Sequence, residues 1–430
     1  MVETIIGFVV LFGLLFLGLP IGVGLMMVGV VGFAVLTDVQ PSLAMFGQIA
    51  YDTTLSYNLS VLPLFILMGN FISQSRLAEE LYRLAYAFMG HLRGGLAMAT
   101  VAACGGFSAM CGSSIATAAT MAKVSIPTMR QFGYADSLAV GAIAAGGTLG
   151  ILIPPSVMLV LYGILTETDI GALFIAGIFP GILGVALYSL AVWVITAKKP
   201  QLAPPGERTD WPERWRAVGR TWPVLVLFLG IMGGLYFGIF TPTEAAGVGA
   251  MGAFLFVLAR GFLNLRVLVR VLIETAATSA KMFIVLIGAL LFSNFINVAG
   301  LPAMLTSWLS EINVPPLGVV ILIMVIYIAL GCVLETLSML LLTIPIFFPI
   351  VNSLGFDPVW FGILVVVVIE ISLITPPIGL NVFVLSSVLS DVTPVTIFRG
   401  VMPFIAADIV RLALIFLIPG IALFLPGLMN

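Results

Sequence analysis

The sequence predicts an all-α polytopic membrane protein built from two inverted repeats, and three observations support this prediction. Hydrophobic residues make up 61% of the 430 residues and charged residues 8%, whereas about 25% of the residues in an ordinary soluble domain are charged. Apolar runs of about 20 residues, long enough to cross a bilayer, recur along the whole chain. A Pro-Pro pair stands inside a long apolar run twice, at Pro154-Pro155 and at Pro376-Pro377. The lipid bilayer is therefore an expected partner, and a nucleic acid is not.

The two Pro-Pro pairs lie 222 residues apart (376 minus 154), and other landmarks keep the same offset. They are Pro127 with Pro349, Gly133 with Gly355, and Asp169 with Asp391. Lysine and arginine collect in cytoplasmic loops, and their distribution alternates between the two halves of the chain. Arg76, Arg83 and Arg93 lie in or beside the first surface segment, for example, whereas its counterpart at 298–315 has no lysine or arginine. Two copies of opposite orientation would give this alternation, and inverted repeats are typical of secondary transporters.

We interpret residues 1–197 as the first repeat and the polar segment 198–221 as a cytoplasmic loop, because that segment carries six lysines and arginines. The run at 5–36 is interrupted near Gly18 and Pro20, so it is either one tilted, kinked helix or two short helices. In chain order, the elements predicted for the first repeat are scaffold spans at 5–75, an amphipathic surface helix at 77–91, a hairpin at 94–126, a broken helix at 136–165 and a span at 170–197.

The hairpin prediction depends on charge and length. Arg93 precedes the stretch, and Lys123 and Arg130 lie at its far end, so both ends are expected on the cytoplasmic side. The stretch is too short to cross the membrane twice, but it can enter halfway, turn and leave. We place the tip at Cys111-Gly112-Ser113-Ser114, because glycine permits the turn and serine hydroxyls cap the helix that starts there.

Residues 222–430 repeat the same order. The predicted elements are spans at 222–299, a surface helix at 301–314, a hairpin at 316–348, a broken helix at 358–389 and a span at 400–427. The second tip is expected near Gly331, Cys332 and Glu335, entered from the periplasmic side. Glu244 is expected to cap the helix that starts after Pro242. Each hairpin tip should meet one Pro-Pro segment.

The Pro-Pro segments are predicted to be unwound. Proline has no amide hydrogen, and its ring clashes with the carbonyl four residues earlier. Each pair should therefore free two carbonyls, those of Gly150 and Ile151 in the first half and of Ser372 and Leu373 in the second. Hydrocarbon offers such groups no hydrogen bond. The freed carbonyls should therefore line a protein cavity or hold an ion.

Where tips and breaks meet, hydroxyls, carbonyls and helix ends would be close together with few formal charges. Such oxygen ligands suit sodium ions, and helix N-termini favour an anionic substrate group. The candidate sodium ligands are Gly112, Ser113, Ser114, Thr117, Gly150, Ile151, Glu335, Thr336, Ser338, Ser372, Leu373 and Thr375. The candidate substrate-binding residues are Ser113, Ser114, Thr148, Pro155, Ser156, Thr336, Thr375 and Asn381. The alternative is that these hydroxyls bond to their own helix or hold helices together.

Acidic residues inside spans are functional candidates, because an unpaired charge there is costly. Glu335 would serve ion binding, proton handling or hydrogen bonding of the tip. For Glu370, a functional role and a structural hydrogen bond to exposed backbone are equal alternatives. Asp408 and Arg411, three residues apart, are expected to form a local pair.

No nucleophile arrangement, CxxC, HExxH, P-loop or cofactor fingerprint occurs in the sequence, so the chain is not expected to be an enzyme or to hydrolyse ATP. Four motifs instead resemble the large membrane subunit of tripartite ATP-independent periplasmic (TRAP) transporters. They are FGIFTPTEAAG at 237–247, CGSSIATAATM at 111–121, LGILIPPS at 149–156 and ITPPIGLN at 374–381. The resemblance covers essentially the whole chain.

The resemblance implies an elevator-type transporter of the ion-transporter superfamily in the bacterial cytoplasmic membrane, coupled to sodium ions. It implies three partners: a small four-helix membrane subunit, a periplasmic substrate-binding protein, and a carboxylate substrate such as a C4-dicarboxylate or a sialic acid. Since this chain starts directly at the large subunit, the small subunit is expected to be a separate polypeptide. One alternative is a stand-alone sodium symporter for di- or tricarboxylates. A passive channel or intramembrane enzyme is a third alternative, and no paired acid or nucleophile supports the enzyme.

Overall fold

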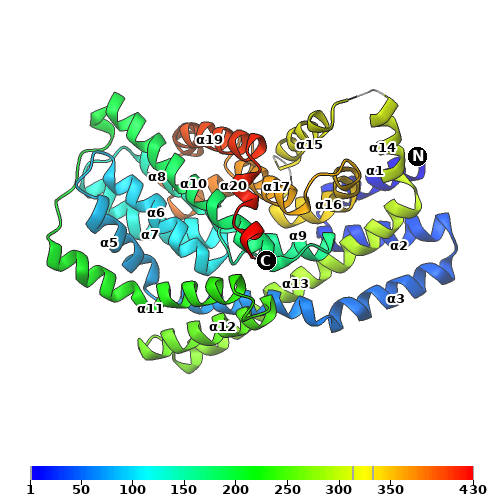
Figure 1. The fold of residues 1–430 in the computed structure, drawn as a ribbon, viewed down its shortest axis with the longest axis horizontal. Helices are drawn as coiled ribbons and strands as arrows, with labels where there is room; N and C mark the ends of the chain where they lie inside the picture. The colour runs from blue at the N-terminus through cyan, green and yellow to red at the C-terminus, as the bar shows by residue number, and fades with distance from the viewer. Residues whose placement is uncertain (1, 312–313, 332–333, 430) are drawn as a thin grey trace.

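The computed structural model describes residues 2–311, 314–331 and 334–429, and every regular element in these ranges is a helix. Figure 1 shows α5 to α8 at one end of the molecule, α1 to α3 with α14 at the other, and α9 and α17 between them. The bounds of the first-half helices are α1 Val2–Phe16, α2 Ile21–Leu36, α3 Val39–Leu55, α4 Val61–Ser73, α5 Leu77–Met89, α6 Gly95–Cys111, α7 Ser114–Gln131, α8 Asp136–Thr148, α9 Val157–Thr166 and α10 Ile170–Lys198.

The second half follows with ten more α-helices. They are α11 Trp211–Tyr236, α12 Pro242–Ala259, α13 Leu265–Val298, α14 Leu301–Glu311, α15 Pro316–Gly331, α16 Thr336–Ser353, α17 Pro358–Ser372, α18 Leu380–Val388, α19 Pro394–Leu417 and α20 Gly420–Leu423. Short 3-10 turns join some of them, including η2 at Leu149–Ile151 after α8. The helices α2 and α4 pack on α13 and α12, while α5 and α19 pack on α6 and α8.

Six of the described helices are long and apolar enough to cross a membrane, and a bent pair, Val39–Leu55 with Tyr57–Ser73, would make a seventh span. The six are α10, α11, α12, α13, α16 and α19. Shorter apolar helices, among them α6, α8, α9, α15 and α17, fall below that length. The chain is thus a multi-pass membrane protein that combines long spans with shorter apolar helices, as expected for an all-α polytopic fold.

The N-terminal region, for which one kinked helix or two short helices were predicted, is described first. The run at 5–36 is two helices, with the break between Phe16 and Ile21. The helix α3 lies within 5–75, where scaffold spans were predicted, although Asp38 and Pro41 are residue types that often interrupt a helix. Both are start signals instead: the Asp38 carboxylate accepts a hydrogen bond from the Val39 N–H at 2.7 Å, and proline is tolerated in a first helical turn.

Two other boundaries were wrong. The predicted loop at 198–221 ends early, because Asp210 precedes a helix that starts at Trp211 with proline in its first turn. The predicted span at 400–427 starts at Pro394 and stops at Leu417, where Pro419 follows and α20 begins at Gly420.

The capping prediction for Glu244 is confirmed, since its carboxylate accepts from the Thr241 N–H at 2.9 Å and the Thr241 hydroxyl accepts from the Glu244 N–H at 3.3 Å.

The two broken helices, α8 with α9 and α17 with α18, run antiparallel to each other. At one end, the Tyr162 hydroxyl on α9 donates to the Pro358 carbonyl at the start of α17 at 2.6 Å. At the opposite end, Arg130 pairs with Asp136 at the start of α8 at 2.8 Å and with Asp391 beyond α18 at 2.7 Å. Each broken helix therefore begins where the other ends.

The Arg130 pairs give a first prediction, for the Arg130→Gln variant. The hydrogen bond from Arg130 lowers the pKa of the Asp391 carboxyl below its usual 3.8. A depressed folded pKa contributes stability above the usual value, and this stability is lost as the pH falls through the folded pKa. The variant should therefore melt slightly earlier than the parent at neutral pH and low salt, and the two should converge in strong acid or high salt.

Thermal unfolding in detergent at several pH and salt values checks this prediction. An Arg399→Gln variant on α19, which changes another exposed arginine, is the control. A difference between Arg130→Gln and the parent that persists in strong acid would show that the pair with Asp391 is not its cause.

Candidate functional site

The first hairpin turns at the predicted tip. The helix α6 ends at Cys111, and Gly112 takes φ +63°, a left-handed conformation that glycine adopts without strain. Ser113 then caps α7, because its hydroxyl oxygen accepts a hydrogen bond from the Ala116 N–H at 3.3 Å. The capping role predicted for this serine is confirmed. The tip places Ser113, Ser114 and, one turn on, Thr117 at the N-terminal end of α7.

This tip packs directly against the first Pro-Pro segment. A Cβ placed on Gly150 would lie 3.0 Å from the Ser108 Cβ and 3.5 Å from the Ser113 carbonyl carbon. One placed on Gly112 would lie 3.5 Å from the Pro155 carbonyl oxygen. The tip and the break can approach each other closely here because each carries a glycine, Gly112 in the tip and Gly150 in the break. The meeting of tip and break that the sequence predicted is found in the first half.

The second hairpin meets the second Pro-Pro segment in the same way. A Cβ on Gly331, the last residue of α15, would overlap the side chain of Ser372 at the end of α17. Glu335 occupies the cap position before α16, and the Ser338 hydroxyl donates to its carboxylate at 3.1 Å. Glu335 thus has the local hydrogen-bonding role that was one of its three predicted alternatives. Cys332, predicted near this tip, lies outside the described residues.

The Pro-Pro segments are unwound as predicted, but their carbonyls are less free than expected. Both Pro-Pro bonds are cis. The Ile151 carbonyl accepts a hydrogen bond from the Ser156 hydroxyl. The Leu373 and Ser372 carbonyls accept from the N–H groups of Asn381 at 3.1 Å and Thr375 at 3.3 Å. The prediction that these three carbonyls lack protein donors is wrong, because Ser156 and Asn381, beyond the prolines, fold back onto the break, and Thr375 bonds within it.

Several of the candidate hydroxyls donate to carbonyls of their own helices. Three examples are Thr148 to the Ala145 carbonyl at 2.7 Å, Ser372 to that of Ile369 at 2.7 Å, and Thr375 to that of Ile371 at 2.6 Å. This is the structural alternative stated for them above. It does not use up their oxygens, because a hydroxyl that donates its one proton keeps lone pairs for a cation.

One candidate, Asn381, has a side-chain oxygen without a hydrogen-bond partner in the described part of the chain. The Asn381 amide nitrogen donates to the Ala144 carbonyl on α8 at 3.1 Å, which joins the second break to the first broken helix. Its other atom, Oδ1, is buried and has no hydrogen-bond partner in the described part of the chain. A buried amide oxygen without a partner is costly, and a cation or a substrate donor would satisfy it. The oxygen atoms available to a ligand between the two breaks are therefore those of hydroxyls, carbonyls and this amide.

A buried ionic cluster next to these breaks was largely missed. Arg411 on α19 pairs with Glu370 on α17 and, at 2.8 Å, with Asp408 one turn away. The Tyr188 hydroxyl on α10 donates to Asp408 at 2.6 Å and lies 3.4 Å from the Thr148 hydroxyl. All five residues are fully buried. The local Asp408–Arg411 pair was predicted correctly, whereas the backbone partner suggested for Glu370 was wrong.

The cluster connects the two breaks. Thr148 ends α8 immediately before η2, and Glu370 lies two residues before Ser372. Between them, Tyr188, Asp408 and Arg411 form a continuous chain of polar contacts. The charges of Glu370, Asp408 and Arg411 inside spans were the sequence signal for it, but nothing in the spacing reveals which helices bring Tyr188 and Glu370 close to the same arginine.

Comparison with known proteins identifies relatives along nearly the whole chain. The family model described as the DctM component of the tripartite ATP-independent periplasmic transporter matches residues 8–421. The C4-dicarboxylate TRAP transporter large permease protein DctM of Pseudomonas aeruginosa is 37% identical over 380 residues, 88% of each chain. The sialic acid TRAP transporter large permease protein SiaM of Vibrio cholerae is 33% identical, covering 100% of this chain and 99% of its own.

A solved structure resembles the fold as well. The YdaH transporter of Alcanivorax borkumensis superposes with a TM-score of 0.66 over 90% of both chains at 16% sequence identity. At that identity the likeness concerns the fold alone. The curated relatives are transporter permeases and not enzymes, in agreement with the expectation from the sequence.

Proposed function

Because this chain belongs to the DctM-component family of tripartite ATP-independent periplasmic transporters, we propose that it imports an organic carboxylate by sodium-coupled secondary transport. The observation that carries the proposal is that each hairpin tip meets one helix break, at Gly150 in the first half and at Ser372 in the second. The names of the relatives refer to C4-dicarboxylates and sialic acid, so a carboxylate of one of these kinds is the proposed substrate.

The proposed mechanism is an elevator built from two inverted repeats, 1–197 and 222–430. The antiparallel course of the two broken helices supports it, since inverted copies would place α8 with α9 against α17 with α18 in this way. In this mechanism the two hairpins and the two broken helices move as one block, with the substrate between the tips. The spans of α1 to α4 and α11 to α13 form the scaffold.

Two sodium sites are proposed, one at each meeting of tip and break. The first would use oxygens of the tip residues 112–114, Thr117 and the Gly150–Ile151 segment. The second would use Glu335, Thr336, Ser338 and the 372–375 segment. The open Oδ1 of Asn381 lies where a substrate would contact both halves. Helix N-termini at the two tips favour a carboxylate there.

The proposed partners follow from the family. A separate small membrane subunit would support the scaffold, and a periplasmic binding protein would deliver the carboxylate to the large subunit. The proposed location is the bacterial cytoplasmic membrane. Uptake by proteoliposomes with both partners supplied tests the whole proposal. Transport that proceeds equally well without a sodium gradient would contradict it, and transport by this chain alone would favour the stand-alone symporter.

Ser114→Ala gives a specific prediction for the first sodium site. Ser114 lies at the tip, and the residue is 6% exposed. Loss of one oxygen ligand should raise the sodium concentration for half-maximal uptake by roughly three- to tenfold, as expected for about 0.5–1.5 kcal/mol. Ser125→Ala on the same helix is the matched control, since the Ser125 hydroxyl is buried and donates to the Met121 carbonyl at 2.7 Å. Equal sodium dependence in both variants, with normal folding, would remove Ser114 from the site.

A further inference from the structure

A charged cavity of about 580 Å³ lies between α5, the start of α11 and the segment at 207–210, well away from the proposed transport site. Four arginines line it: Arg83 on α5, Arg208 before α11, and Arg216 and Arg220 on α11. Four carboxylates line it as well: Glu80, which pairs with Arg260 outside the lining, and Glu207, Asp210 and Glu213. Among the residues that the structure describes, none of the four arginines forms an ion pair with any of these carboxylates. Arginines and carboxylates thus line the same cavity without forming ion pairs with one another.

An apolar cavity of about 310 Å³ continues along the same two helices. Leu81, next to Glu80 on α5, lines it together with Val224 and Phe228, which lie one and two turns beyond Arg220 on α11. One turn of helix is about 5.4 Å, so the two cavities are neighbours. Its other walls are α10 at Ile182, the first hairpin at Ala109, and Ile153 beside the first Pro-Pro pair.

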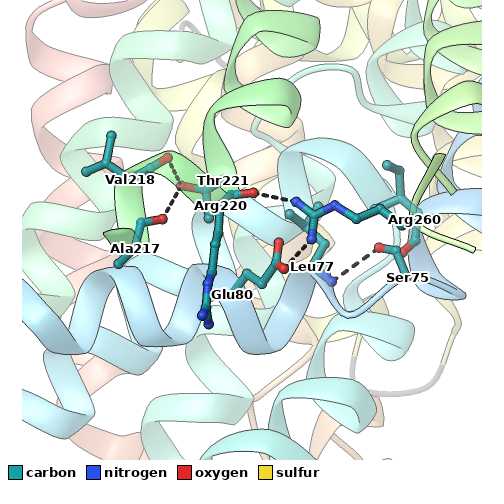
Figure 2. A network of polar contacts seen from close by, with 9 residues as sticks. Ser75, Leu77, Glu80, Ala217, Val218, Arg220, Thr221 and Arg260 are labelled. Atoms are coloured by element: carbon teal, nitrogen blue, oxygen red, sulfur yellow. Dashed lines mark hydrogen bonds and ion pairs between the residues drawn. The ribbon is translucent and has the colours of Figure 1, made fainter. Parts of the chain in front are cut away.

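The junction of the two cavities is held by a polar network, shown in Figure 2. Arg260, which follows α12, pairs with Glu80 and donates to the Arg220 carbonyl at 2.6 Å. This contact fixes the spacing between α5 and α11. The cavities therefore lie between helices whose separation is held by hydrogen bonds, and not between loosely packed surfaces.

The tryptophans of α11 place the charged cavity at the level of the lipid headgroups. Trp211, Trp215 and Trp222 are 62%, 67% and 55% exposed, on a helix long enough to cross the membrane. Tryptophan is enriched at the boundary between headgroups and hydrocarbon. The charged cavity beside them faces the headgroup layer, and the apolar cavity lies deeper along α11.

We propose that the two cavities together bind one zwitterionic phospholipid of the phosphatidylethanolamine type. Guanidinium groups bind phosphate oxygens with two parallel hydrogen bonds, so the phosphate lies among Arg83, Arg216 and Arg220. The ammonium group pairs with Glu207, Asp210 and Glu213. One acyl chain fills the apolar cavity. The mixture of charges selects a zwitterionic headgroup, since a purely anionic lipid would leave the three carboxylates without a partner.

The bound lipid would contact the first hairpin. Its acyl chain reaches Ala109 and Met110, which immediately precede the tip at Cys111. The headgroup lies against α5, which packs along α6. The lipid would therefore fill the space between the first hairpin, α10 and α11.

Native mass spectrometry of the whole protein in mild detergent tests the proposal, with added phosphatidylethanolamine, phosphatidylglycerol or soluble phosphoethanolamine. We expect one phosphatidylethanolamine per protein, bound more tightly than phosphatidylglycerol. Arg216→Ala should weaken this binding about fivefold to tenfold, and the exposed Arg399→Ala on α19 should not. Glu213→Gln should reduce the preference for phosphatidylethanolamine over phosphatidylglycerol.

Leu225→Trp, which fills the apolar cavity, should also weaken binding, whereas Leu229→Trp one turn away on α11 should not, because Leu229 is not part of its lining. Equal lipid binding by Arg216→Ala and Arg399→Ala would overturn the proposal. So would a preference for phosphatidylglycerol, or binding of soluble phosphoethanolamine as tight as that of the lipid. None of these measurements depends on transport.

Discussion

The Arg411→Met variant is expected to lower the free energy of unfolding by about 3–5 kcal/mol, the usual cost of removing one partner of a buried ion pair. Arg411 is the shared counter-charge of Glu370 and Asp408, and none of the three side chains is exposed to solvent. Without the guanidinium, two carboxylates would remain buried next to each other. Methionine fills most of the volume, so the loss would come from charge and not from a cavity.

Thermal and urea unfolding in detergent measure this loss. Arg399→Met on the same helix is the control, since Arg399 is exposed and its replacement should change little. The triple variant Glu370→Gln, Asp408→Asn, Arg411→Met removes all three charges, and neutral replacement of a buried ionic group is often tolerated. It should recover most of the stability. A triple variant as unstable as Arg411→Met would show that packing, and not charge, explains the loss.

The same triple variant separates stability from transport. The ionic chain ends at Thr148 beside the first break and at Glu370 beside the second. If the ionic chain holds the two breaks in register, the triple variant should fold stably, but its transport rate should be lower than that of the parent. The Tyr188 ring packs edge-on against Phe404 at 5.5 Å between centroids, so this part of the arrangement remains without the charges.

The sequence was sufficient for features that depend on local chemistry. Gly112 and Ser113 predicted a turn followed by a capped helix, because a left-handed glycine and a hydroxyl cap have few other uses in an apolar stretch. The Pro-Pro pairs predicted helix breaks for a similar reason. Glu244 and Thr241 form their capping box within four residues. In each case the partners are neighbours in the chain.

The features that were missed depend on distant residues. After each Pro-Pro pair the chain folds back toward the break, where Ser156 donates to the Ile151 carbonyl and Asn381 to that of Leu373. The missing amide hydrogens of proline predict freed carbonyls but do not reveal these donors. Arg411 meets Glu370 only because α17 and α19 pack together.

The Gly150→Val variant is expected to abolish most sodium-coupled uptake while the protein still folds. Even a Cβ at this position would lie 3.0 Å from the Ser108 Cβ and 3.1 Å from its hydroxyl oxygen, and the branched side chain of valine would push the tip from the break. Overpacking of this kind costs about 1–3 kcal/mol. If that cost falls on the ion-bound state, the sodium concentration for half-maximal uptake should rise roughly five- to 150-fold.

Gly233→Val is the matched control, because a Cβ on Gly233 of α11 would meet no atom within 4 Å. Uptake against sodium concentration, together with thermal unfolding, distinguishes a damaged site from a damaged fold. Gly331→Val should act in the same way at the second tip, since its side chain would overlap Ser372. Because the two tips are separate contacts, each variant should alter sodium dependence by itself. Sodium curves of Gly150→Val and Gly331→Val that match that of Gly233→Val would show that close contact between tip and break is not needed for ion binding.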